Sequence, residues 1–483
     1  MEVTKDYTHL FLDARIVQET NNVHLEIGVA EKDARNPLFQ EAFFADPPKH
    51  WEARIDNMYP TVIYDDQEQQ FKLWYCCYIL DEMSNKTPRN QRPKTPYHGG
   101  ENEDGLLYAV SSDGIRWVRP DLGLVEFENS TNNNILMRST THGIHAGGVI
   151  KDDQDPDPTR RYKLFFRNRV HRRMAVAFSE DGLRWSEPVL WPEHNAVGDS
   201  HNNALWAPEL GKYVGFTRGW TIDPYYGVRT VLRTESQDFI HWTEPIEVLR
   251  GRDEHDQIYS MPVFRYRNLY LGLPAIFHKG DREASDWDTV TTELAWSPDT
   301  IEWHRICPGN SIIPTGSGQY PDGNYDCGCV YAAAPIVQGD TIRLYYGGSN
   351  GLHNGWREGS FNLATILLDR FAGYVQSSKD KPGIITTQVL MAQSDELTVN
   401  GEIGSDGALR AAVLDKNASP LPGFGFDDCL QINKGVLAAP VRWHHRRFSD
   451  LAGCQIRVAF ELRAAKLFAF SGCFRREIHV AHS

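Results

Sequence analysis

The sequence predicts an all-β chain, a five-bladed β-propeller followed by a β-sandwich, and the main evidence is a pattern that repeats along the chain. Residues 107–120, LYAVSSDGIRWVRP, join a short apolar strand to a Ser-x-Asp turn and then a Trp. An Asp-Gly pair between two strands is a hairpin signal. Further copies occupy residues 174–188, 229–245 and 292–306, and a weaker copy, with Tyr374 in place of the Trp, occupies 361–375. These copies predict five structural units.

A second repeated pattern precedes each copy of the first. It consists of an apolar strand, a polar turn and a strand rich in Tyr, Phe and aliphatic residues, and it occupies residues 61–78, 147–168, 203–218, 261–274 and 334–348. Together the two patterns supply four strands per unit, which is the strand content of a propeller blade. Loops of different lengths between the units account for the uneven spacing of the repeats.

The stretches outside the repeats define the predicted domains. We expect residues 1–374 to form the propeller and residues 8–19 to close its last blade, because a strand from the opposite terminus removes the exposed edges of the ring. An unpaired amino-terminal arm is the alternative for residues 8–19. After Tyr374 the repeat ends, and short strands separated by Gly, Pro and Asp turns predict a β-sandwich over residues 375–483.

The composition is that of a globular chain with a sizeable core. Of 483 residues, 41% are hydrophobic and 11% aromatic, and the formal net charge is −14. Nucleic acids and anionic membranes need basic patches, so neither is an expected partner. No apolar run is long enough to span a bilayer. The amino terminus lacks the layout of a signal peptide, so we expect a cytoplasmic protein, or a secreted one if an export signal was trimmed.

The eight cysteines fit neither a disulfide framework nor a zinc motif. Cys76 and Cys77 are neighbours in a predicted strand and therefore point to opposite faces. Cys327 and Cys329 form a CxC motif without a second pair. We expect all eight to be reduced thiols.

The predicted functional site lies where the inner ends of the units meet. The innermost strand of each blade starts near the central channel, so the residues just before the five inner strands converge on one opening. Each unit except the second brings a carboxylate to this position, and the second brings histidines. The residues are Asp56 in the first unit, His142 and His145 in the second, Asp199, His201 and Asn202 in the third, Glu254, Asp256 and Tyr259 in the fourth, and Asp326 in the fifth.

Acids, imidazoles and aromatic rings at one concave opening are suited to the cleavage of a glycosidic bond. One acid protonates the leaving oxygen, while a second attacks the anomeric carbon or activates water. A third nearby charge separates the two pKa values. We assign the catalytic roles to Asp56, Asp199 and Asp256. The residues assigned to substrate binding are Trp51, Tyr59, His142, His145, Arg167, His201, Asn202, Arg218, Glu254, Tyr259, Asp326 and His353.

Each of these residues also has a purely structural interpretation. Asp and Asn before a strand often cap turns. Arg167 and Arg218, at the ends of the second strands of their units, are suited equally to a buried ion pair and to holding sugar hydroxyls. The convergence of several units on one opening is what favours a site.

Several stretches resemble a known group of enzymes. LFLDARIVQE, HWEARIDNMYP, SSDGIRWVRPDLGLVEF and YYGGSNGLH are similar to the five-bladed propeller glycoside hydrolases, the group that contains families 32, 43, 62, 68 and 130. The resemblance is most specific to family 32-like proteins with a carboxy-terminal β-sandwich, and it extends over essentially the whole chain.

In that group three acids carry the chemistry, and the resemblance implies which positions correspond. Asp56 matches, by position, the Asp before the first strand of blade 1. The chain departs from the pattern in blade 2, where His142 and His145 stand in place of Arg-Asp-Pro, and in blade 3, where Asp199 stands in place of a Glu-Cys pair. These departures argue against invertase or inulinase activity and leave the general acid unassigned.

The resemblance implies a glycoside hydrolase or transglycosylase that acts on a furanoside, such as a fructoside or arabinofuranoside, with an oligosaccharide or small glycoside as its ligand. The alternative is a propeller that binds carbohydrate without cleaving it. No cofactor is expected. His142, His145, His201 and the acids are a candidate set for a structural divalent cation in the channel, and the oxygen-rich surroundings disfavour zinc.

Overall fold

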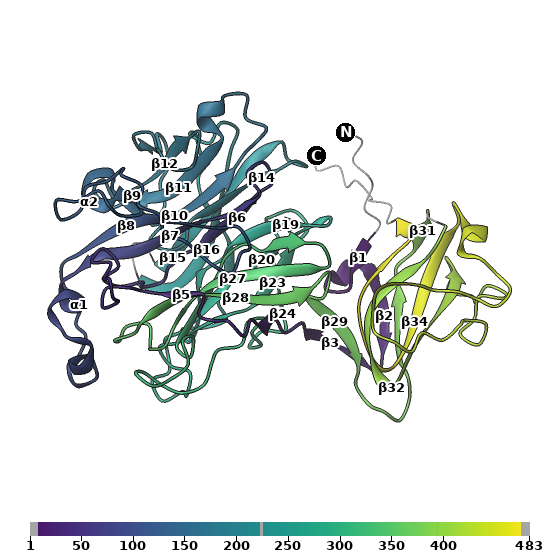
Figure 1. Cartoon of the computed structure of the whole chain (residues 1–483). Coiled ribbons are helices and arrows are strands. Elements are labelled where there is room, and N and C mark those ends of the chain that lie inside the picture. The colour runs from purple at the N-terminus through teal and green to yellow at the C-terminus, as the bar shows by residue number, and fades with distance from the viewer. Residues whose placement is uncertain (1–7, 223–225, 394, 475–483) are drawn as a thin grey trace.

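The computed structural model describes residues 8–222, 226–393 and 395–474, and it confirms the predicted all-β fold with a propeller-like arrangement of sheets (Figure 1). No helix in these ranges is long and apolar enough to cross a membrane. The helices described are α1 (Glu82–Lys86), α2 (Ser139–His142) and the 3₁₀ helices η1 (Ala14–Ile16), η2 (Arg89–Lys94), η3 (Pro158–Arg160) and η4 (Phe448–Leu451).

The first four sequence units each form a separate antiparallel sheet, which has four strands in the described part of the chain. The first sheet contains β6 (Thr61–Asp65), β7 (Gln70–Asp81), β8 (Asn102–Ser111) and β9 (Ile135–Arg138); the second contains β10 (Ile144–Lys151), β11 (Tyr162–Asn168), β12 (Arg173–Ser179) and β13 (Val189–Leu190). The third contains β14 (Asn203–Ala207), β15 (Lys212–Ile222), β16 (Tyr226–Ser236) and β17 (Ile246–Arg250); the fourth contains β19 (Val263–Tyr266), β20 (Leu269–Gly272), β23 (Leu294–Ser297) and β24 (His304–Ile306). In the first three sheets, neighbours in sequence are therefore neighbours in the sheet, as short antiparallel connections allow. In the fourth, β20 and β23 pair although residues 273–293 separate them in sequence.

The Ser-x-Asp turn that defines the sequence repeat has one hydrogen-bond pattern in four units. In the first, Ser111 Oγ accepts from Gly114 N at 2.8 Å and Asp113 Oδ1 accepts from Ile115 N at 2.8 Å. The same bonds recur at Ser179 and Asp181, Ser236 and Asp238, and Ser297 and Asp299. The residue after each of these Asp side chains has a positive φ, at Gly114, Gly182, Phe239 and Thr300. The side chains therefore stabilise a left-handed position that favours glycine even where glycine is absent.

The fifth sequence unit does not form a separate sheet. Its strands β25 (Cys329–Ala332), β26 (Ile336–Gln338), β27 (Thr341–Ser349) and β28 (Gly359–Leu367) belong to a larger sheet, which in the described residues also contains β18 (Asp256–Ser260), β21 (Ala275–His278) and β22 (Val290–Thr292) of the fourth unit. Pro262 and Pro274 interrupt the strands of that fourth unit. Because proline has no N–H to donate, the strands break there. The separated segments β18, β21 and β22 join β25 through the parallel bridge between Val290 and Cys329.

The prediction that residues 8–19 close the last blade is wrong. The outer edge of β28 is paired instead by β4 (Glu31–Lys32) and β5 (Phe39–Gln40). The earlier strands β1 (Thr8–Leu10) and β2 (Val17–Asn21) pair with β34 and β30 in the carboxy-terminal unit. The physical reason is that Phe11 and Ile16, which are fully buried, pack in the core of that unit.

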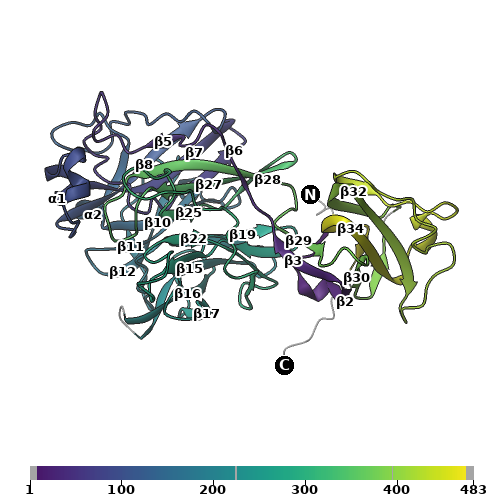
Figure 2. The ribbon, with the colours of Figure 1, turned by 90° about the horizontal axis from the view of Figure 1, so that it is seen from below.

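The carboxy-terminal unit lies beside the blades and includes strands from both ends of the chain (Figure 2). Two long strands, β32 (Thr398–Asp415) and β34 (Gln455–Ser471), pair along most of their length, and their register shifts between Ile403 and Ala408, opposite Ala464, which has a positive φ. This shift lets one sheet fold around a single core, as a β-sandwich does. The other strands described here are β3 (Val23–Ile27), β29 (Ala372–Gln376), β30 (Gly383–Thr387), β31 (Leu390–Ala392), β33 (Val436–Pro440) and β35 (Cys473–Phe474).

Candidate active site

One end of the propeller gathers side chains from different blades. In the first blade the register pairs Asp104, at the start of β8, with Tyr78, near the end of β7, and an isolated bridge pairs Tyr78 with Arg54. The Ser-x-Asp turn lies at the opposite end, because Ser111 pairs with Phe71. A cavity of about 490 Å³ opens at the first end. Its lining includes Asp56, Asp104, Asp199, Tyr59, Tyr78, Tyr97, Tyr259, His145, His353, Arg54, Asn57, Asn102 and Asn354.

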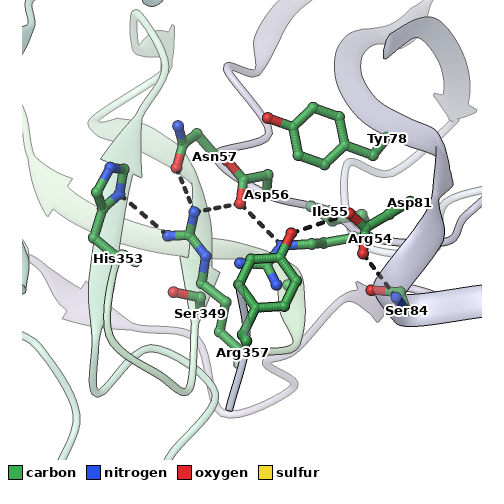
Figure 3. Close-up of polar contacts among 12 residues, drawn as sticks. Arg54, Ile55, Asp56, Asn57, Tyr78, Asp81, Ser84, Ser349, His353 and Arg357 are labelled. Atoms are coloured by element: carbon green, nitrogen blue, oxygen red, sulfur yellow. Dashed lines mark hydrogen bonds and ion pairs between the residues drawn. The ribbon is translucent and has the colours of Figure 1, made fainter. Parts of the chain in front are cut away.

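Two arginines hold Asp56 at the cavity wall (Figure 3). Arg54 Nε donates to Asp56 Oδ1 at 3.0 Å, and the buried guanidinium of Arg357 donates to the same oxygen and, at 3.0 Å, to Asn57 Oδ1. Burial acts to raise the pKa of Asp56, but Arg357 and Arg54 outweigh it and hold the pKa well below the ordinary value of 3.8. Asp56 is therefore ionised at neutral pH and suited to accept hydrogen bonds from a ligand.

Asp199 reaches the cavity from the loop before β14. Arg218 Nη1 donates to Asp199 Oδ1 at 3.1 Å, and the guanidinium of Arg218 also lies 3.8 Å from the centre of the Tyr259 ring. Burial acts to raise the pKa of Asp199, but Arg218 and His145 outweigh it, so the pKa is lowered. No described residue donates a hydrogen bond to Asp199 Oδ2, and 26% of the side chain is exposed. One oxygen of an ionised carboxylate is thus available to a ligand.

Asp104 is a third carboxylate in the same cavity, and sequence reasoning missed it. Its Oδ2 accepts a hydrogen bond from His145 Nδ1 at 3.0 Å and one from Arg169. His145 comes from β10 of the second blade, so the pair joins two blades at the cavity. A carboxylate bound to Nδ1 fixes the imidazole ring and leaves Nε2 as the atom that can exchange a proton with a ligand.

Aromatic rings form the rest of the wall. Asn57 Nδ2 donates to the hydroxyls of Tyr59 and Tyr259, at 2.7 and 3.1 Å, and so joins the first blade to β18. The Tyr97 hydroxyl donates to Asp81 at 3.0 Å, and Arg54 lies 4.0 Å from the centre of the Tyr97 ring. These contacts fix the rings before a ligand arrives, which favours a preformed binding site.

His353 lies at the same wall and is neutral. Its ring packs 4.6 Å from that of Phe277 and 4.8 Å from that of Tyr259, and Nδ1 lies 3.0 Å from the hydroxyl of Tyr331. Burial, together with the nearby Arg357, lowers the pKa of His353 well below 6.5. An uncharged imidazole between aromatic rings is suited to packing against a ligand more than to pairing with an anion.

The structure therefore brings Asp56, Asp199, Tyr59, His145, Tyr259 and His353 together and places the other predicted residues elsewhere. Asp256 does not line the cavity. Its two oxygens accept from Arg305 at 2.9 and 3.0 Å, and Arg252 donates to it from the other side. Because both arginines lie away from the cavity lining, they hold Asp256 in a structural ion pair.

Asp326 and Glu254 are also corrections to the predicted site. Asp326 is buried, where it accepts from the Tyr346 hydroxyl at 2.9 Å and pairs with Lys32 at 2.6 Å. Lys32 belongs to β4, so Asp326 stabilises the closure of the propeller. Glu254 is exposed and lies outside the cavity lining, and its carbonyl oxygen accepts a hydrogen bond from Gln257 Nε2 at 2.8 Å.

The remaining predicted binding residues support the site from behind or lie apart from it. Asn202 Nδ2 donates to the carbonyls of Ala146 and Gly198 and so fixes the loop that carries Asp199. His201 is buried, and burial lowers its pKa to about 3. The other positions, outside the cavity lining, are Trp51, which donates to Asn134; His142, which accepts from Arg138 N; Arg167, which donates to the Val197 carbonyl; and Arg218, behind Asp199.

The residues that sequence reasoning missed are Arg54, Asn57, Tyr78, Tyr97, Asp104 and Arg357. Arg54 and Asn57 flank Asp56 in the sequence, so the same stretch carried their signal. Asp104 stands in NEDGLLYAV, where an acidic pair begins the third strand rather than the first. Arg357 gives no local signal, because its partner Asp56 is 301 positions away.

A candidate metal site lies outside the cavity lining, and the predicted set of channel histidines does not form it. Among the described residues, His255, His278 and Asp286 place ligand atoms within 4.8 Å of one another. However, His255 Nδ1 accepts from Asp281 N at 3.1 Å, so the proton of the neutral ring is on Nε2, which lies 3.1 Å from Asp286 Oδ1. A metal at Nε2 would displace that proton and break the Asp281 contact, so these residues fit a hydrogen-bonded cluster better than a metal.

The chain was compared with known proteins. No protein-family model matches it, and no curated protein matches it. Similar solved structures include a glycosyl hydrolase from Bacteroides ovatus (17% identity, TM-score 0.46, 70% of this chain and 94% of that chain), a β-1,2-mannobiose phosphorylase from Listeria innocua (16%, 0.46, 71% and 98%) and an N-acetylgalactosamine deacetylase from F. plautii (13%, 0.45, 72% and 96%). At identities and scores this low, these similarities carry no conclusion about the reaction. The family 32-like assignment stays a prediction.

Proposed function

We propose that the chain is a carbohydrate-active enzyme that cleaves or transfers the glycosidic bond of a small glycoside bound in the central cavity. The observation that supports this most is the convergence of Asp56, Asp104 and Asp199 with tyrosine rings on one cavity of about 490 Å³. Carboxylates accept hydrogen bonds from sugar hydroxyls, and aromatic rings pack against the apolar face of a sugar ring. The volume is in the range of small-molecule sites.

In this proposal Asp199 is the carboxylate that attacks the anomeric carbon or activates water. It is ionised, as that role requires, and one of its oxygens has no hydrogen-bond donor among the described residues. Asp56 instead binds sugar hydroxyls, because Arg54 and Arg357 fix its position and share Oδ1. Glycoside cleavage needs ionised and protonated groups on opposite sides of the scissile bond.

The proton for the leaving oxygen must come from another group, since Asp56 and Asp199 both have lowered pKa values. We assign this role to His145. Asp104 accepts from Nδ1 at 3.0 Å, which orients the ring and compensates its charge when Nε2 also carries a proton. Transfer of that Nε2 proton to the glycosidic oxygen, as the bond to the anomeric carbon breaks, leaves neutral His145. The water molecule that then bonds to the anomeric carbon through its oxygen returns a proton to Nε2.

The second candidate is a sugar-binding propeller without turnover, and one observation favours it. Glycoside hydrolases keep one carboxyl group protonated near neutral pH by raising its pKa. Here arginines lower the pKa values of both Asp56 and Asp199. If His145 does not supply the proton, the cavity binds a sugar and leaves its linkage intact.

The test is turnover and binding on one panel of ligands. Glycosyl fluorides and disaccharides of common pyranoses are compared with fructosides and arabinofuranosides, which tests the predicted furanoside preference. Each is incubated with and without inorganic phosphate to identify the acceptor. We expect Asp199→Asn to lower kcat by about 100-fold or more on the ligands that the wild type turns over, and His145→Gln to do so on the disaccharides, whose leaving oxygen needs the proton, with little change in KM.

The matched control is Asp256→Asn, which removes a buried carboxylate that does not line the cavity. It should leave kcat and KM within about twofold of the wild type, since a change of about 0.4 kcal/mol or less in the barrier is a factor of two. Full activity in Asp199→Asn would contradict the assigned role. If calorimetry detects sugar binding but no ligand of the panel is turned over, the second candidate, a sugar-binding propeller, is supported and the enzyme is refuted.

A further inference from the structure

A second cavity, of about 560 Å³, adjoins the central one. It lies between the excursion that joins β7 to β8, the loop before β25 and the loop after β27. The excursion contributes residues 92–97, which include part of η2, and the facing loops contribute residues 318–320, 350–352 and 355–356. The first of these walls also continues into the central cavity through residues 97–99.

The two cavities share a wall at Tyr97. This residue lines both of them, and Asn354 in the first is followed by Gly355 in the second. Arg54 Nη2 donates to the Gly355 carbonyl at 3.0 Å, while its guanidinium lies over the Tyr97 ring. The group that holds Asp56 therefore also fixes the boundary between the cavities.

The chemistry of the second cavity differs from that of the first. None of the side chains that line it is a carboxylate in the part of the chain that the structure describes. The Trp356 ring lies 4.9 Å from that of Tyr97 and donates through Nε1 to the Thr95 carbonyl, so it is rigidly placed. Leu352 presents an apolar side chain that is 40% exposed. Rigid aromatic and apolar walls without acids are suited to packing a sugar ring and unsuited to bond cleavage.

We infer that the second cavity binds the part of the glycoside on the leaving-group side of the bond cleaved in the first, so that the preferred substrate has at least two sugar residues. The inference rests on the proposed function, because the second cavity gains this role only if the first holds a sugar. The occupant follows from the adjacency of the two cavities, which share Tyr97 and meet at the consecutive residues Asn354 and Gly355.

The test uses two kinds of ligand that share one sugar. A glycosyl fluoride fills only the first cavity, because fluoride is a single atom, whereas a disaccharide with the same sugar at its non-reducing end needs both. Gly355 has ordinary φ, and an added Cβ would lie 3.8 Å from Leu352 Cβ, so Gly355→Phe can be accommodated and would occupy part of the second cavity beside the shared wall. We expect this variant to lose tenfold or more of kcat/KM on the disaccharide and less than twofold on the fluoride.

A milder variant guards against misfolding. Leu352→Ala should lower kcat/KM for the disaccharide about three- to tenfold and leave kcat/KM for the fluoride unchanged. Its control is Leu210→Ala, which removes a leucine of the same 40% exposure that lines neither cavity. It should change neither substrate.

The outcomes separate this inference from the proposed function. If the wild type turns over fluorides, and Gly355→Phe and Leu352→Ala lower kcat/KM equally on the fluoride and the disaccharide, then the role of the second cavity is refuted while the proposed enzyme function stands. If no ligand turns over, calorimetry still tests the inference. The disaccharide should then bind the wild type at least tenfold more tightly than the monosaccharide does. In Leu352→Ala the two affinities should become equal. Equal binding of the two ligands to the wild type would overturn the inference.

Discussion

Glu41 links the pH of the solution to the loops that carry the candidate site. Its Oε2 accepts from Ile55 N at 2.9 Å and from Gly359 N at 3.1 Å, and so ties the residues next to Asp56 and Arg357 together. Arg92 is 3.9 Å away, and only 9% of the Glu41 side chain is exposed. Burial raises the pKa of Glu41 from 4.5 to about 7.

The folded protein therefore binds this proton more tightly than the unfolded chain does. The resulting stability is fully present below pH 4.5 and is lost as the pH rises through about 7. The gap between the two pKa values corresponds to about 3 kcal/mol. In Glu41→Gln the amide oxygen can still accept both backbone N–H groups, and no charge forms at high pH, so this loss should disappear.

The assay is thermal unfolding of the wild type and Glu41→Gln at pH 5 and pH 8. We expect the melting temperature of the variant, relative to the wild type, to rise by several degrees between the two pH values. The control is Asp65→Asn, since the Lys72 ammonium and the Tyr162 hydroxyl keep the pKa of Asp65 below its ordinary value despite burial, and the group stays ionised across this range. Its difference from the wild type should be the same at both pH values. If the melting temperatures of the wild type and Glu41→Gln change equally between pH 5 and pH 8, the raised pKa of Glu41 is refuted.

Three further predictions concern ion pairs and the core. Asp256→Asn should lower the free energy of unfolding by about 3 kcal/mol, because it leaves a buried arginine, Arg305, with one carboxylate fewer; unchanged denaturant midpoints would contradict this. Asp56→Asn should be less stable than the wild type at pH 7, and the difference in stability should narrow as the pH falls below 3.8, because the unfolded wild-type chain then binds a proton at Asp56 while Arg357 and Arg54 keep Asp56 ionised in the folded protein; circular dichroism melts at pH 3 and 7 measure it. Phe11→Ala should cost about 3 to 5 kcal/mol in the carboxy-terminal unit without changing ligand affinity, since the ring is fully buried there; an equal loss of affinity in calorimetry would show that the two units are coupled.

The parts of the fold that depend on neighbouring residues could be predicted from the sequence. The Ser-x-Asp turn is formed by groups within a few positions, as between Asp113 and Ile115, so its repeat revealed four sheets directly. Ring closure depends instead on β4 and β5, which have two residues each. Strands this short show no hydrophobic periodicity, so the longer apolar stretch at residues 8–19 was assigned to a place that it does not occupy.

The site divides in the same way. Asp56 and Asp199 could be predicted because the start of an inner strand is a local position that points to a central opening. Asp256 stands at an equivalent position, yet Arg305, 49 residues later, turns it into a structural ion pair. Asp104 enters the cavity through the register of β7 and β8, which pairs it with Tyr78. Long-range pairing decides which acids are free to act, and single residues carry no signal of it.

The two ends of each blade face different evolutionary demands. At the end away from the cavity, the serine and aspartate of each turn accept hydrogen bonds from the turn's own backbone N–H groups, so the shape of the turn depends mainly on residues within it. The cavity end is thereby released from a structural duty and can accept insertions such as the excursion that carries Tyr97. We expect natural variation in ligand choice to accumulate in those loops, while the turns behind them change little in shape.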